Sequence, residues 1–310
     1  MATRIESVAT ARSRRGLFSR GAVALSDAAA RACLDRAHRR ADELDLLVNA
    51  GLYKDKNIAE PALASIIQED IGANPGHPPE RDHHGTFSFD VLNGGCGVLS
   101  AAHLVDAFVG PGSARLGMVV AADVDPSPRT SRGFPFSAAG GALLLSHATD
   151  GEGFGRFDFR TFPDEAGLFE VRLSFEPGSG RAFARRGRNV LDVRVSANFA
   201  DKCVEHATEV VAAYLASLGL RAGDVDLLIA SQYPAGFGAE VARAVGIPAD
   251  RLPEVDPALA CAHTAGPLAA LEASLDSGRF ARARVVLFVA AGAGITIGVA
   301  LYGRGDRAEP

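Results

Sequence analysis

The chain of 310 residues contains two sets of similar segments in the same order, and this internal repeat constrains its fold more than any other feature. Residues 45–50 (DLLVNA) match residues 226–231 (DLLIAS), and each run follows a stretch with helical periodicity. Further along, residues 114–122 match residues 283–291, again as apolar runs. Unbroken apolar runs are typical of strands that are covered on both faces of a parallel sheet. The repeat therefore predicts two duplicated βα halves that face each other.

A turn of small residues lies between the matched runs of each half and leads into a predicted helix. In the first half this turn holds Cys96, which follows a predicted strand ending near residues 89–91. In the second half it holds residues 261–264 (CAHT), which include His263. Because α/β folds place their sites at the carboxyl ends of the strands, we expect the two turns to meet where the halves face each other.

Cys96 is a candidate nucleophile because it stands at the predicted start of a helix. The unpaired N–H groups and the positive end of the helix dipole favour a thiolate there and lower the thiol pKa. The neighbouring glycines allow a tight turn and a close approach of an acyl group to the backbone. The alternative is that Cys96 is a small buried hydrophobic residue in a glycine turn. This segment alone does not decide between the two.

Composition restricts the class of protein. With 47% hydrophobic and 22% charged residues, the chain is typical of a soluble globular protein, long enough for one two-lobed unit. A net charge of −5 gives no electrostatic basis for binding nucleic acid or an anionic membrane. The four cysteines form no CxxC pair, and we find neither a signal peptide nor a membrane-spanning run, so we expect a cytoplasmic protein without zinc or disulfides.

Two loops contain clusters of side chains that suggest a binding site, one of arginines and one of histidines. Three arginines in residues 12–15 have the charge for an anion site, with solvated surface charge as the alternative. Three histidines in residues 77–84 do not fall on one helical face, and two prolines interrupt them, so we expect an exposed loop without metal.

The sequence divides into an expected N-terminal lobe, 1–165, and a C-terminal lobe, 166–310. Period-two alternation in 154–162 and 169–175 predicts a hairpin or a crossing connection between the lobes. The other expected elements are strands at 5–9, 45–50, 116–122, 136–145 and 226–231, and helices at 27–40 (capped by Ser26 or Asp27), 61–71, from Cys96 to 109, and 198–218.

As an ordered set, these motifs resemble the thiolase superfamily, and within it the ketoacyl synthase III group and its acyltransferase relatives. Residues 89–91 followed by Cys96 are similar to the nucleophile segment of that group. Residues 136–145 resemble its glycine-rich strand, and residues 262–266 (AHTAG) resemble a His-Thr-x-Gly motif. Residues 290–301 (AAGAGITIGVAL) are similar to its C-terminal glycine loop and strand.

The resemblance implies a layered αβαβα fold and an enzyme that transfers acyl groups from a coenzyme A or carrier-protein thioester. It implies an acyl intermediate on Cys96 and proton transfer by His263. It also implies a dimer, with itself or with a homologous ketosynthase, in which the strand at 114–122 lies near the dimer edge. Coenzyme A or phosphopantetheine would enter as part of the substrate, with no separate cofactor, in polyketide or fatty acid biosynthesis. The remaining expected site residues are Gly95, Gly97, Gly292 and Gly294 for the oxyanion, and Ser231 and Tyr233 along the pocket.

Three departures from the group bear on the activity. In a gapless comparison Gly95 takes the place of the nucleophile, and Cys96 stands one residue later. Ser231-Gln232 stands where the group has a His-Gln motif, and the chain contains no tryptophan. The alternatives are therefore an inactive ketosynthase-like subunit that pairs with an active homologue, or a protein of this fold that only binds an acyl ligand.

Overall fold

The computed structural model describes residues 2–13, 21–55, 60–74, 85–149, 151–176 and 188–303. Arg14, Arg15 and the histidine loop at 77–84 lie outside these ranges, so the hypotheses placed on them are not tested. Within these ranges no group of three or more His, Cys, Asp or Glu side chains is arranged to hold a metal ion. The helices described there include none long and apolar enough to cross a membrane.

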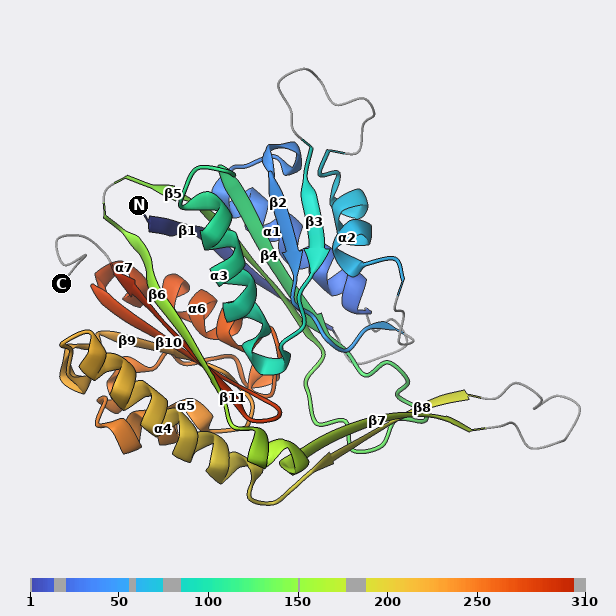
Figure 1. The fold of residues 1–310 in the computed structure, drawn as a ribbon. Helices are drawn as coiled ribbons and strands as arrows, with labels where there is room; N and C mark the ends of the chain where they lie inside the picture. Colours follow the sequence, from blue (N-terminus) through green and yellow to red (C-terminus); the bar gives the residue numbers. More distant parts are fainter. Residues whose placement is uncertain are drawn as a thin grey trace, which may run out of the picture.

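Two sheets of the same topology form the body of the protein (Figure 1). The first has the order β1 (Ala2–Arg12), β5 (Ala139–Ala148), β4 (Leu116–Asp123), β2 (Leu46–Asn49) and β3 (Phe87–Asp90). The second has the order β6 (Gly153–Thr161), β11 (Thr296–Gly303), β10 (Val285–Gly292) and β9 (Leu227–Ala230). In each sheet the second strand is antiparallel to the first and to the third, and the fourth is parallel to the third; the first sheet adds β3, parallel to β2. The shared order supports the duplication predicted from the repeat.

One aspartate per lobe explains why the repeated runs begin with the same residue. The Asp45 carboxylate accepts hydrogen bonds from the backbone N–H groups of residues 115 and 116, at 2.7 and 3.2 Å. Asp226 accepts the equivalent pair from residues 284 and 285, at 2.9 and 3.1 Å. Each carboxylate therefore ties the start of one parallel strand to the start of its neighbour.

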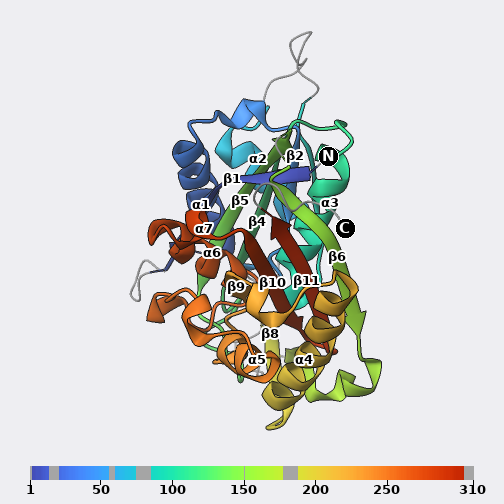
Figure 2. The same ribbon diagram turned by 90° about the vertical axis from the view of Figure 1, so that its left-hand side faces the viewer.

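Helices fill three layers around the two sheets (Figures 1 and 2). The outer layer of the first sheet is α1 (Ala22–Ala37) and α2 (Leu63–Ile71), and that of the second sheet is α4 (Phe199–Ser217) and α5 (Phe237–Val245). Between the sheets lie α3 (Gly97–Val109) and α6 (Gly266–Asp276), which contact both, and the short α7 (Arg279–Arg282) follows α6. A helix between two sheets must be apolar on opposite sides, as the buried residues of α3 are. The layered αβαβα fold is confirmed.

Two local expectations need correction. Helix α1 begins at Ala22 rather than at residue 27, and the Asp55 carboxylate accepts from the N–H of Val23 at 3.4 Å. Strand β9 lies at an edge of its sheet rather than in the centre, although its four residues are buried. Strand β4 is internal and wholly buried, the edge strands of the first sheet are β1 and β3, and the expected position of the 114–122 strand near a dimer edge stays a prediction.

The segment with period-two alternation divides between two structures. Strand β6 pairs with β11 and belongs to the second sheet, so the first sheet ends at Ala148, before the expected lobe boundary at residue 165. Strands β7 (Phe169–Glu176) and β8 (Arg188–Val195) form a separate antiparallel ribbon that extends from the body (Figure 1). The segments 154–162 and 169–175 therefore do not pair with each other, and the antiparallel partner of β7 is β8, which the alternation did not include.

Asp27 provides a test of how α1 packs against α2. This side chain is only 8% exposed, and burial together with the nearby Asp70 carboxylate raises the pKa of Asp27 to about 6. An unfolded aspartate titrates near pH 3.9, so the folded protein holds this proton more tightly and loses stability as the pH rises from about 4 to 6. Asp27→Asn should raise the free energy of unfolding by about 1–2 kcal/mol at pH 7.5 and change it little at pH 4.5.

Denaturant unfolding at the two pH values measures this difference. Asp35→Asn, on the exposed face of the same helix, is the matched control and should show no pH-dependent change. An equal effect of Asp27→Asn at both pH values would contradict the burial of an ionisable Asp27.

Candidate active site

The carboxylate of Asp123, at the end of β4, joins the two lobes. One oxygen accepts hydrogen bonds from the N–H groups of Leu52 and Tyr53, at 2.9 and 2.7 Å. The other accepts from His263 Nδ1 at 3.0 Å and from the N–H and hydroxyl of Thr264 at 3.0 and 2.6 Å. Five donors from both lobes thus converge on one side chain that is 1% exposed. Sequence analysis missed Asp123, and its only signal is an aspartate directly after the apolar run at 114–122.

The pKa of Asp123 reflects these contacts. Burial acts to raise it, but the charge and hydrogen bond of His263, with the bonds from Thr264 and Tyr53, outweigh burial and hold the pKa below its usual value. Asp123 is therefore ionised at neutral pH. An ionised carboxylate only accepts hydrogen bonds, so the proton of the neutral His263 ring lies on Nδ1. The other ring nitrogen, Nε2, is left with the lone pair that a base requires.

Aromatic rings surround the His263 imidazole. Its ring stacks on Phe136 with centroids 4.2 Å apart and lies 5.5 Å from the ring of Tyr53. Phe136 also packs edge-on against Tyr233 at 4.8 Å. The side chain of His263 is almost enclosed, and this packing together with Asp123 fixes its orientation. The structure thus brings His263 and Tyr233 to one aromatic wall.

Cys96 lies at the start of α3, as the sequence predicts, but its surroundings differ from the expectation. The thiol is fully buried and donates to two carbonyl oxygens, Thr296 O at 3.2 Å and Ala290 O at 3.5 Å. Burial raises the pKa of Cys96 to about 12, against the lowering expected from the helix dipole. Carbonyl oxygens stabilise the thiol and repel a thiolate, so Cys96 is a neutral thiol in this conformation.

The glycine turn before Cys96 is closed by the end of β10. A β-carbon added to Gly95 would lie 2.1 Å from the carbonyl oxygen of Ala291, so no other side chain fits there without movement. A β-carbon at Gly292 would lie 3.5 Å from the N atoms of Gly95 and Cys96. The structure therefore brings Gly95, Cys96 and Gly292 together.

The other two expected glycines have separate positions. Gly97 packs against Ala50, whose carbonyl oxygen would be 3.0 Å from an added β-carbon. Gly294 turns the chain between β10 and β11 with a φ of +97°, which favours glycine. Which N–H groups would hold an oxyanion stays a prediction.

Ser231 contacts the same end of β10 as Cys96 does. It is 2% exposed, and its hydroxyl oxygen accepts from Ala291 N at 3.2 Å. Within the described residues no hydrogen bond joins the Cys96 thiol to the His263 ring. The catalytic roles of Cys96 and His263 therefore stay predictions. The Cys96 thiol lies against the end of β10, whereas the His263 imidazole is hydrogen-bonded to Asp123.

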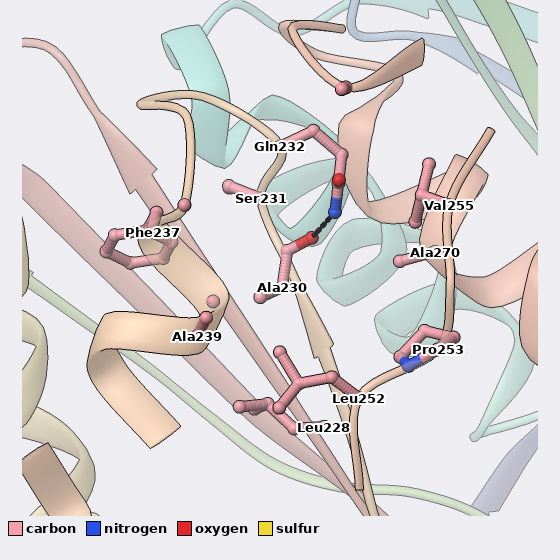
Figure 3. Close-up of a pocket in the computed structure, with 13 residues that line it drawn as sticks. Leu228, Ala230, Ser231, Gln232, Phe237, Ala239, Leu252, Pro253, Val255 and Ala270 are labelled. Atoms are coloured by element: carbon pink, nitrogen blue, oxygen red, sulfur yellow. Dashed lines mark hydrogen bonds between the residues drawn. The ribbon is translucent and has the colours of Figure 1, made fainter. Parts of the chain in front are cut away.

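A cavity of about 210 Å³ opens beside Ser231, between β9, the first turn of α5 and α6 (Figure 3). Most of its lining residues have apolar side chains, among them Leu252, Val255 and Ala270. The Gln232 amide donates to Ala230 O at 3.0 Å along the wall. Ser231 lines this cavity and Tyr233 does not, and neither Cys96 nor His263 is among the lining residues, so the pocket roles of Ser231 and Tyr233 stay predictions.

Comparison with known proteins identifies the family. The family model described as 3-oxoacyl-[acyl-carrier-protein (ACP)] synthase III C terminal matches residues 215–303. A beta-ketoacyl-[acyl-carrier-protein] synthase III of Rhodospirillum centenum is 30% identical over 285 residues, covering 89% of this chain and 82% of the relative. The chain belongs to the ketoacyl synthase III family. The corresponding protein of Thiobacillus denitrificans is 26% identical over the same shares of both chains.

Solved structures of other proteins have the same fold over nearly the whole length of this chain. A 3-oxoacyl-[acyl-carrier-protein] synthase III of Aquifex aeolicus has a TM-score of 0.78 at 17% identity, over 97% of this chain and 100% of that one. A variant of Xanthomonas campestris OleA with bound lauric acid and lauroyl-CoA also has a TM-score of 0.78, at 15% identity, over 98% of this chain and 99% of that one. The predicted family is confirmed, and its relatives are named as synthases, so the expectation of an enzyme is supported.

Replacement of Asp123 tests the connection between the lobes. Asp123→Asn removes the negative charge beside His263 and Thr264. The amide NH₂ group of the asparagine would also face either the Leu52 and Tyr53 N–H groups or the donors of His263 and Thr264, none of which can accept its hydrogens. We expect the free energy of unfolding to fall by about 3 kcal/mol at pH 7. Because the pKa of Asp123 is lowered in the folded state, this contribution is present above about pH 4 and is lost as the pH falls further.

Chemical denaturation at pH 7 and pH 3.5 measures both parts of this expectation. Asp125 accepts one hydrogen bond from the Ser127 N–H, which the amide oxygen of an asparagine can still accept, so Asp125→Asn, two residues later, is the matched control. If Asp123→Asn were no more destabilising than that control, the five donors would not be what joins the lobes.

Proposed function

We propose that this member of the ketoacyl synthase III family transfers an acyl group from a coenzyme A or carrier-protein thioester through an acyl-Cys96 intermediate, with His263 as the acid–base group. The observation that carries this proposal is the 3.0 Å contact between His263 and the ionised Asp123. That pair directs a basic Nε2 away from Asp123 and favours the imidazolium that forms when the ring takes a proton.

The proposed step conserves atoms and charge. The Cys96 sulfur attacks the thioester carbonyl carbon, and its proton passes to His263 Nε2. The tetrahedral intermediate expels the thiolate of coenzyme A or phosphopantetheine, which takes that proton. An acceptor then removes the acyl group from Cys96. Backbone N–H groups near Gly95 and Gly292 are the candidates for stabilising the oxyanion.

The described conformation represents the state before this reaction. The Cys96 thiol donates to Ala290 O and Thr296 O and is closed off from solvent. For acylation, the end of β10 must move away from the glycine turn. Once freed, the sulfur stands at the N-terminus of α3, where the helix dipole favours the thiolate.

Mass spectrometry of the intact protein after incubation with a panel of acyl thioesters tests the proposal. Wild type should gain the mass of one acyl group, and Cys96→Ala should gain none. His263→Ala should acylate about 10²–10⁴-fold more slowly, because the proton acceptor is lost. His103→Ala, which removes an exposed imidazole stacked on Phe157, and Cys33→Ala are the matched controls and should acylate normally.

The second candidate function is an inactive subunit that pairs with an active homologue. In the gapless comparison, position 95 is the place of the nucleophile. The Ala291 carbonyl oxygen fills the space that a side chain at this position would need, and this observation favours the inactive subunit. A wild type that never acylates, with Cys96 inert to iodoacetamide, would support this candidate and contradict the first.

We propose that a second copy, or a homologous ketosynthase, pairs with the exposed edge strand β3. Phe87 on this strand is 59% exposed, and Leu92 and Phe108 beside it are 52% and 36% exposed. The Phe87 ring lies 5.2 Å from Phe89 and 6.3 Å from Phe108, so the apolar side chains adjoin one another. An exposed edge strand with apolar side chains is a template for pairing with another chain.

Phe87→Lys should convert a dimer to a monomer at micromolar concentration, measured by light scattering. Phe175→Lys is the matched control, since Phe175 is 66% exposed on the β7–β8 ribbon, and it should leave the dimer intact. A wild-type monomer that captures no homologous partner would contradict pairing at β3.

A further inference from the structure

One peptide unit lies between Ser231 and Cys96. The N–H of Ala291 donates to the Ser231 hydroxyl oxygen at 3.2 Å, and the carbonyl of the same unit, Ala290 O, accepts from the Cys96 thiol at 3.5 Å. The two groups of a trans peptide point in opposite directions. Ser231 and Cys96 therefore hold this unit from opposite sides.

The same serine ends the pairing of β9 with β10. The N–H of Ser231 donates to Val289 O at 3.0 Å, which continues the parallel ladder by one residue. At the next step the Ser231 hydroxyl, rather than a backbone carbonyl, accepts from Ala291. The side chain of Ser231 thus holds the last residues of β10 on the β9 side, while β11 pairs with them on the other side.

The carbonyl that follows fills the space beside Gly95. Ala291 O would be 2.1 Å from a β-carbon at position 95, and it belongs to the residue whose N–H Ser231 holds. Movement of this segment away from the glycine turn would open it, and the hydrogen bond to Ser231 on one side and the pairing of residues 290–292 with β11 on the other hold the segment where it is. On the β9 side, access to Cys96 and the space at position 95 therefore depend on the Ser231 side chain.

We infer that Ser231 is a positioning residue that keeps the end of β10 closed over Cys96, and that release of the Ala291 N–H from Ser231 precedes reaction of the thiol. The inference rests on the proposed acyl-Cys96 step, for which it names the control of access. Gly95 is the second part of this control, because only glycine leaves room for the Ala291 carbonyl.

Alkylation by iodoacetamide, followed by peptide mass spectrometry, tests this without any acyl thioester. Loss of the one hydrogen bond in Ser231→Ala should raise the labelling rate of Cys96 about fivefold. Ser231→Thr keeps the hydroxyl and should label like wild type. Gly95→Ala, which displaces the Ala291 carbonyl from the other side, should also raise the rate, whereas Gly167→Ala, in open space, should not.

Two other cysteines in the same sample act as internal controls. Cys33 is as buried as Cys96, and burial raises its pKa also to about 12, so it reports global unfolding. Cys261 is partly exposed and should label fastest in every variant. Equal rises at Cys96 and Cys33, or no rise at Cys96 in either Ser231→Ala or Gly95→Ala, would overturn the inference. Failure of acyl transfer with the labelling pattern intact would instead overturn the proposed function alone.

Discussion

The buried carboxylate of Asp123 is the interaction on which the rest of the structure depends. A charge in a dry interior is costly unless donors satisfy it, and here five donors from two lobes do so. Because His263 and Thr264 both bond to Asp123, their turn has one position relative to the first lobe. The same contacts leave the basic nitrogen of the imidazole for a substrate.

At Cys96 two physical effects oppose each other. The N-terminus of α3 favours a thiolate, by about 1 kcal/mol or less at most helix ends. Burial favours the thiol and outweighs the backbone hydrogen bond from Gly298, so the pKa is raised to about 12. The end of β10 therefore determines whether the helix dipole can act on the sulfur. In the proposed mechanism, the reactivity of Cys96 depends on the position of this strand end, which Ser231 contacts.

The sequence was sufficient for the fold because the repeated apolar runs and their leading aspartates are local patterns that specify strands and their partners. It also located the start of α3 at Cys96. It could not predict Asp123, because an aspartate after a strand caps a loop in many proteins, and only the second lobe supplies His263 and Thr264. A buried Cys96 was one of two alternatives that the sequence left open, and the sequence could not decide between them, because the carbonyl oxygens of residues 290, 291 and 296 come from the other lobe, where no sequence pattern specifies their direction.

The tautomer of His263 tests the central claim most directly. Nitrogen NMR of ¹⁵N-histidine-labelled protein, with His263→Gln to assign the signal, reports which ring nitrogen carries the proton in the neutral ring. An ionised Asp123 beside Nδ1 requires the proton on Nδ1 and a lone pair on Nε2. A neutral ring protonated at Nε2 would contradict the account, because Nδ1 would then face the carboxylate without a proton and Nε2 would have no lone pair for catalysis.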